Sequence, residues 1–199
     1  MGKANMAEDP RIDPRIKAVF ANLDLGPSAD VQDRQEILTA ASSEEGRAAE
    51  EFLRAFLAMS DSEDIAPSTG LDISDHELVS EPDGNTLKLC LIRPQSPDPV
   101  PCVYYIHGGG MATMSCYYGN YQAWGRMIAA NGVAVAMIDF RNAVSPSSVP
   151  EVAPYPAGLN DCVSGLKWLV SQTAALNIDV DKIIVAGESG GGNLTLATV

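Results

Sequence analysis

Ser189 is the residue of this chain whose neighbours most clearly indicate chemistry. It is the centre of GESGG, residues 187–191, a G-x-S-x-G sequence. A β-branched apolar run precedes this motif and apolar residues at helical spacing follow it, which predicts a strand, a tight turn and a helix. A serine in such a turn projects as a nucleophile, and the N–H of Gly190 lies where an oxyanion would form. Because the turn is tight, the positions that flank it, Gly187 and Gly191, must lack bulky side chains.

The motif alone leaves a second interpretation open. Glycine-rich turns between a strand and a helix also bind phosphate, and five-residue matches arise by chance. The dinucleotide fingerprint G-x-G-x-x-G is not met, because Ser189 occupies the second glycine position if Gly187 is the first. No Walker lysine follows the glycines either. A second motif upstream favours the interpretation in which Ser189 is a nucleophile.

This second motif is HGGG, residues 107–110, directly after the apolar run CVYYI. Acyl transfer passes through a tetrahedral intermediate whose negative oxygen needs two or three N–H donors. Consecutive glycines let a backbone approach a substrate closely and turn its N–H groups inward. Three glycines after a predicted strand, in the same chain as a G-x-S-x-G sequence, therefore indicate the other half of an oxyanion hole.

With these motifs the sequence resembles the hormone-sensitive lipase family of α/β-hydrolases, the bacterial esterases of the HGGG type. The matching segments, in chain order, are residues 107–110, 139–141, 154–158 and 187–191. The resemblance covers about residues 70–199, and the first 60 residues resemble the helical N-terminal part of that family's cap. It implies an α/β-hydrolase fold and a carboxylesterase that needs no metal and no organic cofactor. The substrates it implies are short-chain acyl or aryl esters.

The resemblance also implies the roles of the residues that react. Ser189 corresponds to the nucleophile. Two departures from the family accompany it: position 190 is glycine where alanine is frequent, and Glu188 stands where Asp or Thr is common. The expected oxyanion hole consists of Gly109, Gly110 and Gly190, with Gly108 completing the loop.

Other matching residues are expected to support the site. His107 corresponds to the motif histidine, which braces the loop in the family and is not the catalytic base. Arg141 and Asp161 resemble a structural pair that pins the loop ahead of a helix. Gly187 and Gly191 keep the serine turn tight.

The rest of the chain supplies elements that could position these motifs. Strands are predicted near residues 73–80, 86–93, 102–106, 133–139 and 183–186, with helices near 117–131 and 157–175. Strands that are apolar throughout and alternate with helices indicate a mostly parallel sheet covered on both faces. A turn signal at 82–85 makes the first two strands an antiparallel edge hairpin.

The N-terminal third is expected to be helical and amphipathic. Short helices are predicted at about 12–23 and 31–41, and a third begins at the capping box formed by Ser42 and Glu45. We divide the chain into a helical cap with a linker, residues 1–70, and an incomplete hydrolase core, residues 71–199.

Composition limits the partners and the compartment. The 199 residues carry a net charge of −13, which disfavours nucleic acid and anionic lipid. No apolar run approaches the ~18 residues of a membrane span, and the N-terminus does not read as a signal peptide. The four cysteines lack C-x-x-C spacing and indicate free thiols in a cytoplasmic protein. A small ester is the expected partner, and a homodimer is compatible with the sequence.

Half of the catalytic machinery is missing from this sequence. The order of a triad in this fold is Ser, then Asp or Glu, then His, yet the ten residues after Ser189 contain none of these acids or bases. The two histidines, His76 and His107, both precede the serine. Serine is a poor nucleophile without an adjacent base.

Two explanations follow from this gap. In the favoured one, a segment beyond Val199 supplies the acid, the histidine and further strands. Otherwise the sheet would end at the strand that leads to Ser189, residues 183–186, which is normally central, and would expose an apolar edge. In the alternative, the protein uses the hydrolase fold to bind a small molecule, as a receptor would, without catalysis.

Overall fold

The computed structural model describes residues 9–20 and 31–199. By its internal contacts the chain divides into two units, residues 1–33 and 34–199, which are described separately. In the first unit, helix α1 spans Pro14–Phe20. The predicted helix extended to Leu23, which lies outside the described residues.

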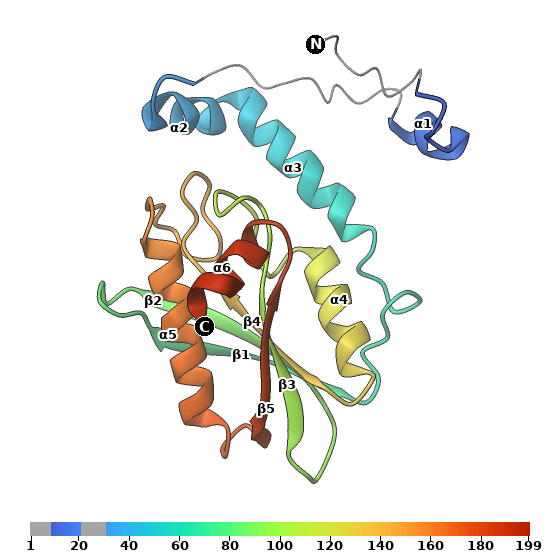
Figure 1. The fold of residues 1–199 in the computed structure, drawn as a ribbon, viewed down its shortest axis with the longest axis vertical. Helices are drawn as coiled ribbons and strands as arrows, with labels where there is room; N and C mark the ends of the chain where they lie inside the picture. Colours follow the sequence, from blue (N-terminus) through green and yellow to red (C-terminus); the bar gives the residue numbers. More distant parts are fainter. Residues whose placement is uncertain (1–8, 21–30) are drawn as a thin grey trace. The chain divides into compact units, whose positions relative to one another are not determined.

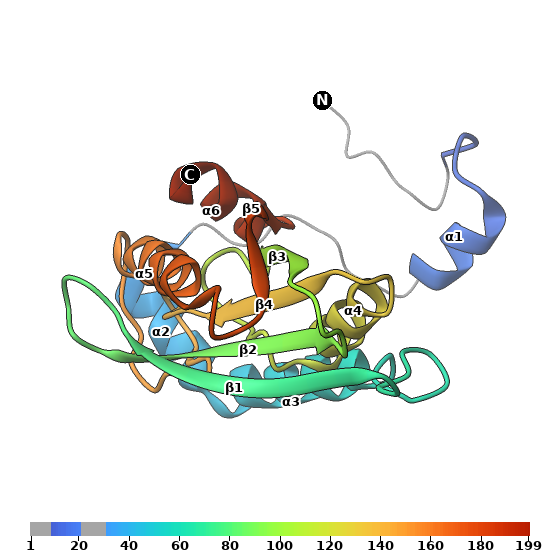
Figure 2. The ribbon, with the colours of Figure 1, turned by 90° about the horizontal axis from the view of Figure 1, so that it is seen from below.

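The second unit is built on a five-stranded sheet with the order β1-β2-β4-β3-β5. Figure 2 shows β1 at one edge and β5 at the other. The strands β1 and β2 form an antiparallel hairpin, β2 pairs antiparallel with β4, and β3 pairs parallel with both β4 and β5. Four strands thus share one direction, which confirms the mostly parallel sheet with an antiparallel edge hairpin. The strands are β1 (Leu71–Val79), β2 (Thr86–Pro94), β3 (Val100–Ile106), β4 (Ala134–Asp139) and β5 (Ile178–Gly187).

Helices cover both faces of this sheet, as the apolar strands predicted. In Figure 1, α5 and α4 lie on opposite sides of β3 and β5. Alternate residues of β3 face the two sides: Tyr104 packs in the cluster that includes Leu169 of α5, and Tyr105 in the cluster that includes Tyr121 of α4. All six residues of β4 are buried, because apolar clusters lie on both of its faces. The helices are α4 (Gly119–Ala129), α5 (Ala157–Gln172) and α6 (Gly190–Thr198).

Two further helices, α2 (Arg34–Ser42) and α3 (Glu44–Ala58), precede the sheet, and α3 packs against α4. The predicted capping box was wrong by one residue. Ser42 is the last residue of α2, and Ser43 is the N-cap of α3, where its Oγ accepts a hydrogen bond from the N–H of Gly46 at 3.0 Å. The sequence places two serines in succession, and the continuation of α2 through the first leaves the second to cap. The predicted boundary between cap and core at residue 70 stays a prediction.

The strand that leads to the serine lies at the edge of the sheet. Its side chains Val180 and Ile184 are 51% and 61% exposed, and Leu196 of the following helix is 81% exposed. Among the described residues, β5 therefore presents an apolar edge. Within the described residues, no helix has both the length and the apolar character that a membrane crossing requires.

Candidate active site

The turn that carries Ser189 joins the end of β5 to the start of α6. Ser189 has a φ of +52°, a conformation that residues with side chains rarely adopt, and its side chain is exposed. A Cβ added to Gly187 would lie 2.5 Å from the carbonyl oxygen of Gly191, and one added to Gly191 would lie 2.1 Å from that of Ile106. Side chains are thus excluded at both flanking glycines, and the serine is the side chain at the tip.

The HGGG loop meets this turn because β3 and β5 are parallel neighbours that end together, with Ile106 paired to Gly187. A Cβ added to Gly190 would lie 2.9 Å from both the nitrogen and the Cα of Gly110, and 2.8 Å from the nitrogen of Met111. The two glycine-rich segments, about 80 residues apart in the sequence, are therefore in direct contact.

Hydrogen bonds determine which N–H groups of the loop remain free. The carbonyl of Gly108 accepts from His107 Nδ1 at 2.9 Å, and the carbonyl of Gly109 accepts from the N–H groups of Ala112 and Thr113 at 3.0 and 3.1 Å. In a trans peptide the C=O and the next N–H point in opposite directions. Anchoring these two carbonyls therefore turns the N–H groups of Gly109 and Gly110 to the other side of the chain.

Of the four N–H groups expected to line the oxyanion hole, three are free within the described part of the chain and one is engaged in a hydrogen bond. Among the described residues, none accepts a hydrogen bond from the N–H of Gly109, Gly110 or Gly190. The N–H of Gly108, in contrast, donates to the hydroxyl of Tyr121 at 3.0 Å. The geometry thus leaves three neighbouring N–H groups free for a ligand oxygen and engages the fourth in holding the loop.

His107 lies behind the loop. Its side chain is fully buried and stacks on Phe140 with ring centroids 4.3 Å apart. Nε2 is 3.6 Å from Oδ1 of Asp139. Burial lowers the pKa of His107, although the nearby carboxylate of Asp139 opposes this, so the ring is neutral at pH 7. A neutral ring that uses its Nδ1–H on the Gly108 carbonyl is suited to bracing the loop, the role expected from the sequence.

Asp139 organises the loops around the site, a role that the sequence analysis did not assign. Its carboxylate is fully buried and accepts hydrogen bonds from the N–H groups of Cys116 and Ser148 at 2.8 and 2.6 Å, and from the hydroxyl of Ser115 at 3.0 Å. The end of β4 is thereby tied to the loop before α4 and to the loop before α5.

Arg141 and Asp161 form the predicted pair. Arg141 Nε and Nη2 donate to Asp161 Oδ2 and Oδ1 at 2.9 and 2.8 Å, and the Arg141 backbone N–H donates to Oδ2 at 2.9 Å. Asp161 is fully buried. The side-chain hydrogen bonds to Asp161 raise the pKa of Arg141 above its ordinary value. Both carboxylate oxygens are engaged, so neither is free to orient a histidine, as expected of a structural pair.

Neither histidine lies where it could take a proton from Ser189. The ring of His76, on β1, is 5.4 Å from that of Trp168 on α5, and its Nε2 is 2.9 Å from the hydroxyl of Ser74. His107 is occupied behind the loop, as described above. Within residues 9–20 and 31–199, no group of three or more His, Cys, Asp or Glu side chains is arranged to hold a metal ion.

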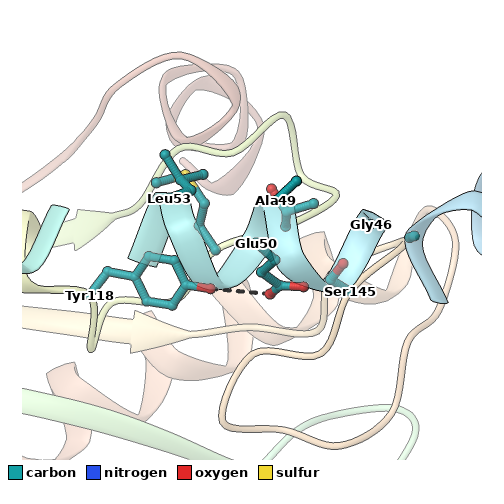
Figure 3. Close-up of a pocket in the computed structure, with 9 residues that line it drawn as sticks. Gly46, Ala49, Glu50, Leu53, Tyr118 and Ser145 are labelled. Atoms are coloured by element: carbon teal, nitrogen blue, oxygen red, sulfur yellow. Dashed lines mark hydrogen bonds between the residues drawn. The ribbon is translucent and has the colours of Figure 1, made fainter. Parts of the chain in front are cut away.

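A cavity of about 230 Å³ lies between α3 and the segment that follows the HGGG loop (Figure 3). Met114 separates it from the loop, since its Cγ would lie 2.9 Å from a Cβ added to Gly109. At its polar side, the Tyr118 hydroxyl donates to Glu50 at 3.2 Å. The cavity is suited to a small, mostly apolar group. Its lining consists of Ala41, Gly46, Ala49, Glu50, Leu53, Thr113, Met114, Tyr118 and Ser145.

Comparison with protein families gives a match over residues 90–198 to the family described as BD-FAE. Among curated proteins, "Ethyl acetate hydrolase" of Pseudomonas putida is 33% identical over 128 residues, which are 61% of this chain and 36% of that protein. This chain therefore spans little more than a third of that relative's length.

Solved structures give broader matches. A structure of esterase Est22 is 65% identical, has a TM-score of 0.91, and is matched over 98% of this chain and 57% of that chain. The same esterase with p-nitrophenol gives a TM-score of 0.90. Brefeldin A esterase, described as a bacterial homologue of human hormone-sensitive lipase, is 29% identical with a TM-score of 0.74, over 96% of this chain and 52% of that chain.

Proposed function

We propose, from the premise that this chain belongs to the BD-FAE family, that the complete protein is a serine carboxylesterase for short-chain acyl or aryl esters. The family match covers more than half of the chain. The predicted α/β-hydrolase fold and the predicted resemblance to hormone-sensitive lipase are confirmed by the likeness to Est22 and brefeldin A esterase. The observation that carries the proposal is the contact between the Ser189 turn and a loop in which the N–H groups of Gly109 and Gly110 have no acceptor among the described residues.

In the proposed reaction, Ser189 Oγ attacks the carbonyl carbon of the ester. The carbonyl oxygen becomes negative and accepts hydrogen bonds from the N–H groups of Gly109, Gly110 and Gly190. The C–O bond to the alcohol then breaks, and the proton taken from Ser189 passes through a histidine to the departing alcohol. Water attacks the resulting acyl-enzyme and releases the acid with Ser189 restored.

We place the histidine and its acidic partner in a segment that follows Val199. This chain spans 57% of the Est22 chain, and β5 offers an exposed apolar edge on which further strands could pair. The substrate range is supported by the likeness to Est22, whose structure is known with p-nitrophenol. No cofactor takes part in the proposed steps.

The cysteines and the net charge support a compartment and a class of ligand for the proposed esterase. All four cysteines are unpaired and buried, which supports a reducing compartment, and we place the protein in the cytoplasm. The net charge of −13 supports a small uncharged ester as the ligand in preference to nucleic acid or an anionic membrane.

Covalent labelling tests this function directly. The complete protein is expected to hydrolyse p-nitrophenyl acetate and butyrate, and a fluorophosphonate probe should add to Ser189, as read from the mass of the peptide that contains it. Simple amides and long-chain esters serve as the comparison substrates. If the folded complete protein neither hydrolyses these esters nor takes the label, the non-catalytic binding protein is favoured instead.

A second test concerns the glycine after the serine. Gly190→Ala would place a methyl group less than 3 Å from backbone atoms of Gly110 and Met111, so the loop must shift by tenths of an ångström. Because the shift moves oxyanion donors, kcat is expected to fall about 10-fold. Gly192→Ala, in the same helix, is the matched control, since its Cβ has no neighbour closer than 3.4 Å. Equal kcat values for the two variants would contradict the close approach.

A further inference from the structure

Tyr121 of α4 and Glu188 of the serine turn are linked by a hydrogen bond that connects both glycine-rich segments. We propose that Tyr121, oriented by Glu188, is a positioning residue that fixes the oxyanion loop in its active conformation. This inference rests on the proposed esterase function. Neither residue is expected to touch the substrate: Tyr121 acts through Gly108, and Glu188 acts through Tyr121.

The hydroxyl of Tyr121 has two oxygen or nitrogen partners on two different segments, and a longer contact with Met114 Sδ at 3.8 Å. It donates to Glu188 Oε1 at 2.7 Å and accepts from the N–H of Gly108 at 3.0 Å. A hydroxyl carries one proton and two lone pairs, so donation to the carboxylate leaves a lone pair for the Gly108 N–H. The carboxylate, an acceptor only, thus selects the orientation of the hydroxyl that can hold the loop.

The surroundings keep this hydroxyl in place. Tyr121 is 4% exposed, and its ring lies 5.7 Å from that of His107 and 6.2 Å from that of Tyr105. Burial, followed by the hydrogen bond to Glu188, raises the pKa of Tyr121 above its ordinary value. The hydroxyl therefore keeps the proton that it donates throughout the pH range in which the protein would work.

Glu188 also packs directly on the loop. A Cβ added to Gly108 would lie 2.0 Å from Oε1 and 2.6 Å from Cδ of Glu188. The carboxylate therefore occupies the space in which any side chain at position 108 would lie. Glutamate stands here where the hormone-sensitive lipase family commonly has Asp or Thr, and its side chain reaches both Gly108 and the hydroxyl of Tyr121.

Gly108 is consequently held on both of its peptide groups. Tyr121 accepts from its N–H, and His107 donates to its C=O. Because the peptide that carries the Gly108 carbonyl also carries the N–H of Gly109, fixing Gly108 fixes the direction of a proposed oxyanion donor. Without the Tyr121 hydroxyl, one of the two anchors is lost and the donor can rotate.

The experiment compares variants of the complete protein on p-nitrophenyl acetate. Tyr121→Phe is expected to lower kcat about 10- to 100-fold with KM within about threefold. Affinity for a trifluoromethyl ketone, which forms a tetrahedral adduct with the serine, should fall in parallel with kcat/KM.

Glu188→Ala should lower kcat to a similar extent. Glu188→Gln, which keeps an acceptor of the same length, should lower kcat less. The double variant Tyr121→Phe/Glu188→Ala should be no worse than Tyr121→Phe, since Glu188 acts through Tyr121.

Tyr117→Phe is the matched control. It removes another tyrosine hydroxyl that donates to a carboxylate, that of Asp75 at 2.8 Å, in the same segment but away from the loop. Its kcat should stay within about twofold of that of the unmodified protein, because no oxyanion donor depends on it. Unchanged kcat in Tyr121→Phe, or multiplicative effects in the double variant, would overturn the inference.

Amide exchange at Gly108 gives a readout that is independent of catalysis. The exchange rate of this N–H, followed by NMR, should rise at least about tenfold in Tyr121→Phe and stay unchanged in Tyr117→Phe. An exchange rate that Tyr121→Phe leaves unaltered would also overturn the inference. If the unmodified protein has no esterase activity while the exchange result holds, the proposed function fails and the anchoring of the loop stands.

Discussion

Replacing Ser189 with alanine is expected to lower kcat for p-nitrophenyl acetate by at least about 10⁴-fold in the complete protein. The reason is chemical: alanine has no oxygen to attack the ester, so no acyl-enzyme forms. The free N–H groups of the loop remain, so the residual rate should stay above that in buffer and KM should change little. Initial rates over a range of substrate concentrations provide the measurement.

The variant should fold as the unmodified protein does. Ser189 is exposed, and alanine adopts its φ of +52° at a similar cost, so the thermal midpoint should stay within about 2 °C. Ser171→Ala, at an exposed serine of α5, is the control for loss of a hydroxyl elsewhere. An alanine variant that kept more than a few per cent of the activity would remove Ser189 from the mechanism.

Much of this site could be predicted because each half is local in the sequence. Gly187 and Gly191 are separated by only three residues, and the contact that excludes a side chain at Gly187 lies within the turn, with the carbonyl of Gly191. At Gly191 the excluding contact comes from Ile106 at the end of the neighbouring strand β3, which no local pattern shows. The HGGG loop is likewise a single run. The apolar strands before the two motifs predicted a mostly parallel sheet, and β3 and β5 are indeed parallel, although their being neighbours was not predicted.

What could not be predicted depends on contacts between distant residues. Tyr121 has helical spacing with apolar neighbours and its ring does pack in the core, so the pattern carried no sign of its hydroxyl. The partner of that hydroxyl, Glu188, is 67 residues away. Similarly, the three donors to Asp139 come from two loops whose paths no periodicity describes. Strand order is a further example, since β4 lies between β2 and β3.

Asp161→Ala is expected to lower the free energy of unfolding by about 3–5 kcal/mol. The carboxylate is fully buried and receives hydrogen bonds from the side chain and the backbone N–H of Arg141 and from the hydroxyl of Ser80. Its removal leaves a guanidinium that is 8% exposed with one remaining carboxylate, that of Asp83. Urea unfolding followed by circular dichroism measures the change.

Asp83→Ala separates burial from charge, because Asp83 contacts the same guanidinium at 2.7 Å but its side chain is 42% exposed. Solvent screens that pair, so its loss should cost less than about 1 kcal/mol.

The activity of Asp161→Ala then distinguishes the two roles that a carboxylate upstream of the serine could have. If the pair is structural, folded Asp161→Ala should retain kcat within about threefold, since neither oxygen is free to orient a histidine. If instead stability is unchanged while kcat falls about 10³-fold or more, Asp161 is the acid of the triad, and only the histidine has to come from a segment after Val199.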